Sequence, residues 1–251
     1  MDASLTECGF TLDERLAAAL RGNDAARFLA TRDRDGRPYL VPALSAQSAE
    51  GGLIRFAAIF PAAVERNLAL GGSLALLVVD EKLRWWSLAG RLEGFADGAA
   101  GEAVRRWGRL RPTGLLARGE PSTWGLVAEY SLLRLFGIPR GDGYADTLPR
   151  EVALRLQTLQ NVKGIAFVDA ENRLIALPCQ SLRPAGPGAV VCGTWLVPEL
   201  RRVPPLARVA ICVLTFEPNA YQIHGCFEGI GGGLLRTAAT IRVSGLQPAL
   251  A

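Results

Sequence analysis

The 251-residue sequence is poor in lysine and histidine. Lys82 and Lys163 are its only lysines and His224 is its only histidine, so arginine carries nearly all of the positive charge. A single histidine and the lack of any Cys-x-x-Cys pair argue against a zinc site of the usual ligand spacing. The five cysteines are odd in number and widely spaced, which does not suit a disulfide framework. We expect most of them to be buried as small hydrophobic residues.

Long apolar runs and blocks of like charge are also missing. No uninterrupted apolar stretch reaches the length that spans a bilayer, and the acidic N-terminus "MDASLTECGF" lacks the basic and then apolar pattern of a secretory signal. No five or six like charges follow one another, and no basic segment interleaved with aromatic residues stands out. We therefore expect a cytoplasmic protein with no membrane or nucleic-acid partner.

The sequence contains one pattern twice. "FLATRDRDGRPYLVPALS" aligns with "GIAFVDAENRLIALPCQS" at an offset of 136 residues, and after one gap the offset becomes 135. A match over about seventy residues with a single gap indicates an internal duplication. Aligned pairs include Asp33 with Asp169, Arg37 with Arg173, Pro42 with Pro178, Ser45 with Ser181, Arg66 with Arg201, and Glu93 with Glu228.

Each copy has the pattern of a small β-barrel. Short apolar runs such as "RFLAT" and "GIAFVD" end at tight turns, and a second run follows each turn, which predicts antiparallel strands. "SLALLVV" and "VAICVLTF" are almost wholly apolar and predict strands buried on both faces. "PAAVERNLAL" predicts a short helix, whereas the two prolines of "PELRRVPPL" argue against a regular one. Five or so strands with one short helix are typical of a small closed barrel.

The segment between the copies has a different periodicity. "GAAGEAVRRWGRL", "TWGLVAEYSLLRLFG" and "LPREVALRLQTL" show apolar residues at three- and four-residue spacing, which predicts helices. The predicted organisation is a first repeat with an N-terminal helix at 1–97, a helical linker packed on the barrels at 98–160, and a second repeat at 161–251. The fold class is mainly β with a helical linker (α+β).

The order of elements resembles the pyridoxamine 5′-phosphate oxidase-like family of FMN-binding split β-barrels. "TRDRDGRP", "VERNLALGGSLALLVVD" and "LAGRLEG" carry the resemblance in the first copy, and "VDAENR" and "YQIHGCFEG" carry it in the second. It covers about residues 25–97 and 161–244. The resemblance implies two tandem split β-barrels that form a pseudo-dimer, FMN in a groove between them, and oxidoreductase activity. Such a chain would be a monomer or would form a homodimer.

Candidate ligand-binding residues follow from the alignment with this family. Its phosphate loop, often Ser-Arg-Lys before the short helix, is replaced here by "PAAV" and "VPE", so no catalytic residue is carried over. Arginines that recur beside the short helix in both copies could bind a phosphate instead, although a solvated helix face is the alternative. A threonine near the flavin is common in the family, which favours the groove of the second copy. The predicted cofactor-binding residues are Thr194, Trp195, Arg201, Arg202, Arg66 and Asn67.

His224 leaves further functions open. It stands where the other copy has Ala89, and it could be a haem ligand or a hydrogen-bonded structural residue. No other metal site is expected. The sequence thus allows an FMN-dependent oxidoreductase of unknown substrate, a haem-binding or haem-handling protein, or a cofactor-free binding module with eroded flavin sites. We expect one small-molecule ligand in the groove between the barrels, because the strands of each barrel close around their own side chains.

Overall fold

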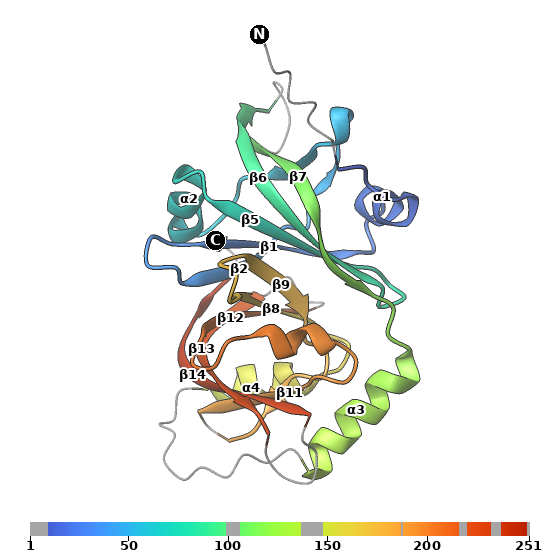
Figure 1. Ribbon diagram of the computed structural model, residues 1–251, viewed down its shortest axis with the longest axis vertical. Coiled ribbons are helices and arrows are strands. Elements are labelled where there is room, and N and C mark those ends of the chain that lie inside the picture. Colours follow the sequence, from blue (N-terminus) through green and yellow to red (C-terminus); the bar gives the residue numbers. More distant parts are fainter. Residues whose placement is uncertain are drawn as a thin grey trace.

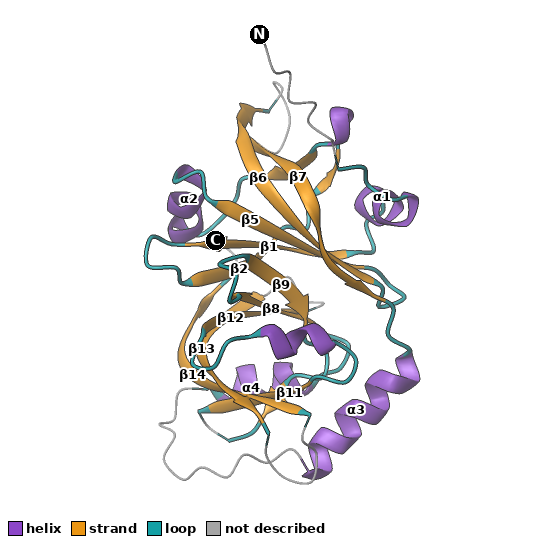
Figure 2. Ribbon diagram, in the orientation of Figure 1, coloured by secondary structure: helices purple, strands orange, loops and turns teal. Residues whose placement is uncertain are grey.

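The structure of the protein is a computed structural model that describes residues 10–98, 106–136, 148–186, 188–215, 220–231 and 237–249. Two seven-stranded antiparallel sheets dominate it, and the helices lie around their edges (Figures 1 and 2). The mainly β class and the two split-barrel-like halves are therefore confirmed. None of the described helices combines the length and hydropathy that crossing a membrane requires.

The first sheet has the strand order β2-β1-β5-β6-β7-β4-β3. Helix α1 (Glu14–Arg21) precedes it, and α2 (Ala62–Ala69) follows the short 3-10 helix η1 (Glu50–Gly52) and strand β4. The strands are β1 (Ala26–Arg32), β2 (Pro38–Pro42), β3 (Gln47–Ser48), β4 (Ile54–Ala57), β5 (Ser73–Val79), β6 (Trp85–Asp97) and β7 (Arg106–Gly119).

The second sheet repeats the first. Its order, β10-β11-β14-β13-β12-β8-β9, is the same arrangement read from the other edge. The 3-10 helix η2 (Pro198–Arg202) takes the place of α2, as the prolines of that segment predict. The strands are β8 (Val162–Val168), β9 (Leu174–Pro178), β10 (Arg183–Pro184), β11 (Ala189–Gly193), β12 (Arg208–Leu214), β13 (Ala220–Ile230) and β14 (Ala238–Pro248).

Strand β7 corrects the helix predicted for "GAAGEAVRRWGRL". Residues 99–105 lie outside the described part of the chain, but from Arg106 onward the segment pairs with both β6 and β4. Leu110 is buried while Arg109 and Arg111 are exposed, which is the two-residue period of a strand. The other two predicted helices are present as α3 (Thr123–Phe136) and α4 (Arg150–Gln157). The linker boundaries at 98 and 160 stay a prediction, with β7 completing the first sheet inside them.

The two copies make the same local contacts. The Asp33 carboxylate accepts the Arg37 amide hydrogen at 2.8 Å, and Asp169 accepts that of Arg173 at 2.9 Å, so the same hairpin turn forms twice. The segments "LAGRLEG" and "YQIHGCFEG" both end in Glu-Gly, and the glutamate makes the same contact in each copy. The ion pair between Glu93 and Arg111 recurs between Glu228 and Arg242, where nitrogen and oxygen are 3.2 Å apart. The repeated glutamate therefore joins the last two long strands of each sheet.

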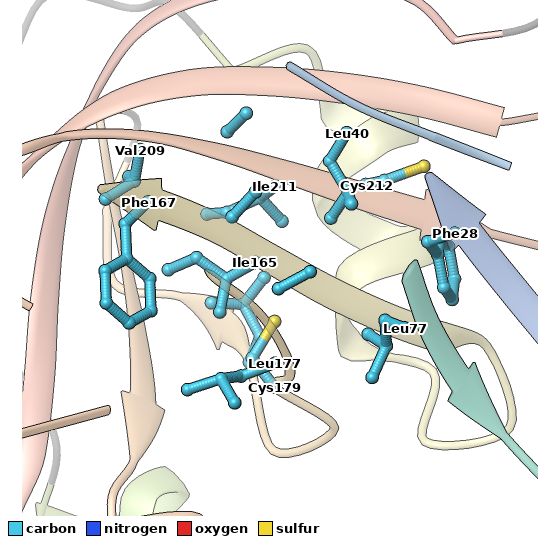
Figure 3. Packing of buried hydrophobic residues seen from close by; sticks show 14 of the residues in the cluster. Phe28, Leu40, Leu77, Ile165, Phe167, Leu177, Cys179, Val209, Ile211 and Cys212 are labelled. Carbon is cyan, nitrogen blue, oxygen red and sulfur yellow. The ribbon is translucent and has the colours of Figure 1, made fainter. Parts of the chain in front are cut away.

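The two sheets pack on each other through strands β1, β2 and β5 on one side and β8, β9 and β12 on the other. Figure 3 shows this layer, in which apolar side chains of both repeats form one cluster. A separate cluster, built around Phe56, Leu76 and Leu110, fills the interior of the first barrel. The side chains at the centre of the layer between the sheets are Phe28, Leu40, Leu77, Ile165, Leu177 and Ile211.

Candidate functional site

The groove of the second repeat is almost filled. The cavity between the ends of β9 and β11, helix α3 and Trp85 of the first repeat has a volume of about 20 Å³. That is room for a single water molecule, whereas pockets for small molecules usually measure about 300–1,000 Å³. A flavin ring therefore does not fit this groove while α3 lies in it. Its lining includes Leu126 and Glu129 of α3, Cys179, Ser181 and Gly193.

Glu129 closes the groove from the side of α3. Its side chain is only 6% exposed, and its Oε1 atom accepts the backbone N–H of Trp195 at 2.8 Å and of Leu196 at 3.2 Å. Gly193 makes this contact possible, because a Cβ atom there would lie 2.1 Å from the Cδ atom of Glu129. Backbone N–H groups that precede a short helix can donate hydrogen bonds to an anion. The chain thus places its own carboxylate on amides that could otherwise bind a phosphate.

The four residues predicted for the second groove do not line this cavity. Thr194 is buried and its hydroxyl donates to the Thr237 carbonyl at 3.0 Å. Trp195 is 59% exposed, and Arg201 and Arg202 are exposed on η2. Glu129, which sequence reasoning missed, lines the cavity and accepts the backbone N–H of Trp195, one of the predicted residues. It sits in the middle of an apolar helix, and no local pattern marks it as a partner of the Trp195 amide.

A larger cavity lies in the first repeat, between α2 and the β1–β2 hairpin. It has a volume of about 630 Å³ and is open to solvent. Two of the predicted residues line it, and Asn67 is held there by donating its side-chain N–H to the Thr31 hydroxyl at 3.2 Å. The residues that line the cavity are Asp33, Arg34, Asp35, Tyr39, Ala63, Arg66, Asn67, Ala69 and Leu70.

The first-repeat cavity offers side chains of the β1–β2 hairpin that the second repeat lacks, whereas Arg66 is matched there by Arg201. Arg34 and Arg66 bring two guanidinium groups, and a carboxylate oxygen of Asp33 is engaged with the Arg37 amide. At an offset of 136 the second repeat has Ala170 in place of Arg34 and Ile175 in place of Tyr39. The hairpin residues Arg34 and Tyr39 were not among the sequence predictions, because only the packing of α2 brings them beside Arg66.

His224 has the contacts of a structural residue. Its Nε2 atom is 3.0 Å from the side-chain nitrogen of Gln247, which can donate to it, and the Tyr39 ring packs edge-on with centroids 5.2 Å apart. Burial, together with the positive charge of Arg37, lowers the pKa of His224, although Asp33 opposes this. Iron ligation through Nε2 would require the Gln247 contact to break.

Other buried titratable side chains lie in the core of the second repeat. Cys179, Cys192 and Cys212 are buried as predicted, and burial raises the pKa of the Cys179 thiol to about 12. Cys226 is half-buried, and Cys8 lies outside the described residues. Lys163 is fully buried, donates to the Gln180 carbonyl at 3.1 Å, and has its pKa lowered by burial to about 8. Among the described residues, no three His, Cys, Asp or Glu side chains are grouped to hold a metal ion.

Comparison with known proteins finds no matching family model and no matching curated protein. Among solved structures, an F420 reductase is 20% identical over 41% of this chain and 98% of its own, with a TM-score of 0.34. An FMN-binding protein from Syntrophomonas wolfei is 10% identical over 39% of this chain and 86% of its own, with a TM-score of 0.31. PlzA of Borreliella burgdorferi, solved with c-di-GMP, is 10% identical over 94% of this chain and 86% of its own, with a TM-score of 0.23. These likenesses concern the fold alone.

Proposed function

We propose that this chain is a cofactor-free binding module, whose second groove is closed by α3 and whose first repeat binds a small anionic molecule. The observation that carries the proposal is the Glu129 carboxylate on the amides of Trp195 and Leu196. An anionic ligand would have to displace both this charge and the helix that bears it. The cavity between α2 and the β1–β2 hairpin is open to solvent. Its lining sets the guanidinium groups of Arg34 and Arg66 beside two carboxylates, of which Asp33 is engaged with the Arg37 amide and Asp35 is the other.

The chemistry of the first-repeat cavity favours a phosphorylated ligand. The planar guanidinium groups of Arg34 and Arg66 can each donate two parallel hydrogen bonds to phosphate oxygens. Tyr39 and Asn67 add an aromatic face and an amide at the same wall. The open cavity is also large enough for a nucleotide-sized molecule, since its volume falls within the usual range for ligand sites.

An FMN-dependent oxidoreductase is the second candidate. The two split-barrel-like halves favour it, because the family that the sequence resembles binds FMN. FMN does not fit the second groove as α3 closes it, so it would bind in the first-repeat cavity with its phosphate at Arg34 and Arg66. We assign no catalytic residue and no substrate. A haem function has less support, since the Nε2 atom of His224 already has a partner.

Titration calorimetry of the purified full chain with FMN, riboflavin and pyrophosphate tests the site. We expect the two phosphorylated probes to bind and riboflavin, which lacks the phosphate, to bind at least about tenfold more weakly, a difference of about 1.4 kcal/mol. The variant Arg66→Glu should lose this binding. The double variant Arg201→Glu/Arg202→Glu is the matched control in the second repeat and should bind as the wild type does.

Two results would contradict the proposal. Binding that survives Arg66→Glu and disappears in the Arg201→Glu/Arg202→Glu variant would move the ligand to the second groove. Failure of both phosphorylated probes to bind the wild-type chain would show that the cavity does not select phosphate. A flavin spectrum in the protein as purified would instead support the oxidoreductase candidate. The cytoplasmic location and the choice between monomer and homodimer stay predictions.

A further inference from the structure

A patch of arginines covers the outer face of the first sheet, away from the cavity described above. It consists of Arg55 on β4, Arg91 on β6, and Arg109 and Arg111 on β7, all of them exposed. The registers place Arg55 directly opposite Arg109 and Arg91 directly opposite Arg111. The end of the β6–β7 hairpin that carries most of the patch extends away from the second sheet (Figure 1).

The charges of this arginine patch are poorly balanced. Glu93 forms an ion pair with Arg111, and it is the one carboxylate with an ion pair to the patch among the described residues. Like charges directly opposite each other on neighbouring strands destabilise a sheet. Glu93 balances the charge of Arg111, whereas the facing pair Arg55 and Arg109 has no ion pair with a carboxylate among the described residues. That pair therefore costs the free protein stability, and an anionic partner would relieve the cost.

The second repeat shows that the fold does not require these arginines. At the positions that match Arg55, Arg91 and Arg109, the second sheet has smaller or uncharged side chains, while the ion pair of Arg242 with Glu228 is retained. The ion pair is thus common to both copies, and the additional charge belongs to the first copy alone. The three matching residues are Val191, Cys226 and Thr240.

An aromatic ring lies beside the guanidinium groups. Trp107 is two residues before Arg109 on β7, and the Arg55 guanidinium carbon is 5.0 Å from the centre of its ring. Ala238 occupies the matching position of the second sheet. Arginine and tryptophan side by side on an open sheet provide both phosphate contacts and a surface on which bases can stack.

We propose that this arginine patch binds the backbone of single-stranded nucleic acid without sequence preference. Four guanidinium groups on three neighbouring strands can contact successive phosphates, and Trp107 can stack on a base. The patch contains no exposed aliphatic side chain of the kind that anchors a protein in a membrane. The proposal differs from the expectation from sequence of no nucleic-acid partner, and it is independent of the ligand proposed for the first-repeat cavity.

Fluorescence anisotropy of a labelled 20-nucleotide oligo(dT) with the full chain tests the proposal. The variant Arg55→Val/Arg109→Thr gives the first sheet the residues of the second. We expect this variant to bind at least about tenfold more weakly. The plot of log affinity against log salt concentration should become less steep by about 1.4, which is about 0.7 for each of the two phosphates that the variant no longer neutralises. The control Arg15→Ser/Arg118→Ser removes the same charge at side chains that are each 68% exposed elsewhere, and should bind as the wild type does.

A charge-conserving variant controls for a loss of binding that is caused by misfolding. Arg55→Lys/Arg109→Lys should keep most of the affinity, and the unfolding midpoint of the Val/Thr variant should not fall, because it removes a like-charge pair. Three results would overturn the proposal: no binding of oligo(dT) by the wild type, equal weakening in the Arg15→Ser/Arg118→Ser control, or binding of anionic vesicles or polyglutamate in preference to the oligonucleotide.

Discussion

Replacement of Glu129 by alanine should destabilise the protein and release α3 from the second repeat. The carboxylate oxygen accepts two backbone N–H groups, at 2.8 and 3.2 Å, in a site where the side chain is 6% exposed. Hydrogen bonds to a charged group contribute about 1.5–3 kcal/mol each, and the longer of the two is the weaker. We therefore expect Glu129→Ala to cost about 2–4 kcal/mol. Glu129→Gln keeps an acceptor oxygen and should cost about 1 kcal/mol.

Gly193 provides an independent test of the same contact. The methyl group of Gly193→Ala would lie 2.1 Å from the Cδ atom of Glu129, so the carboxylate would have to leave its amides. The strand itself accepts alanine, since Ala57 occupies the matching position of the first repeat. The single variant should thus cost about as much as Glu129→Ala. In the Glu129→Ala background the same change should cost less than about 0.5 kcal/mol, because both substitutions break one contact.

Urea unfolding followed by circular dichroism gives the four free energies of this double-mutant cycle, and hydrogen exchange of the α3 amides reports whether that helix detaches first. The reasoning predicts strong coupling between Glu129 and Gly193 and faster exchange in α3 in both single variants. Additive effects of the two substitutions, or a cost below about 0.5 kcal/mol for Glu129→Ala, would show that the carboxylate does not hold α3 in the groove.

Two further predictions concern buried titratable groups. The pKa of His224 is lowered in the folded protein, so the unfolded chain binds a proton more readily. The free energy of unfolding should therefore fall as pH decreases through about 6.5. His224→Gln should reduce this dependence, which urea midpoints measured at several pH values would show. Burial likewise lowers the pKa of Lys163 to about 8, so stability should rise between pH 8 and 10.5. Lys163→Met should therefore stabilise the protein by up to about 3 kcal/mol at pH 7, and an unchanged midpoint there would contradict this.

The duplication was predictable from the sequence because its signals are local. The hairpin turns of Asp33 and Asp169 depend on residues within four positions of each aspartate. Ser45 and Ser181, which the repeat aligns, accept the amide hydrogens of Ala57 and Gly193 at 2.7 and 3.0 Å, so residues that the alignment pairs also make equivalent longer contacts. The two-barrel fold follows from such short-range patterns, which the pairing of neighbouring strands then preserves.

Tertiary packing decided what the periodic pattern alone could not. The segment of β7 has arginines and apolar residues at spacings that also suit a helix, and its pairing with β6 and β4 made it a strand. Arg66 and Asn67 were identified from the alignment, whereas Arg34 and Tyr39 joined them only through the packing of α2 against the hairpin. The sequence therefore identified two of the nine residues that line the first-repeat cavity.

The sequence by itself determined that two copies of one barrel exist and that the copies differ in their polar residues. Only the tertiary structure decided which groove is closed and where charge accumulates. Glu129 reaches the Trp195 amide across 66 positions of the chain, and Arg55 meets Arg109 through the register of β4 with β7. Such contacts depend on how distant segments pack and pair, which no local pattern encodes, because each side chain has the same local sequence whether or not its partner lies beside it.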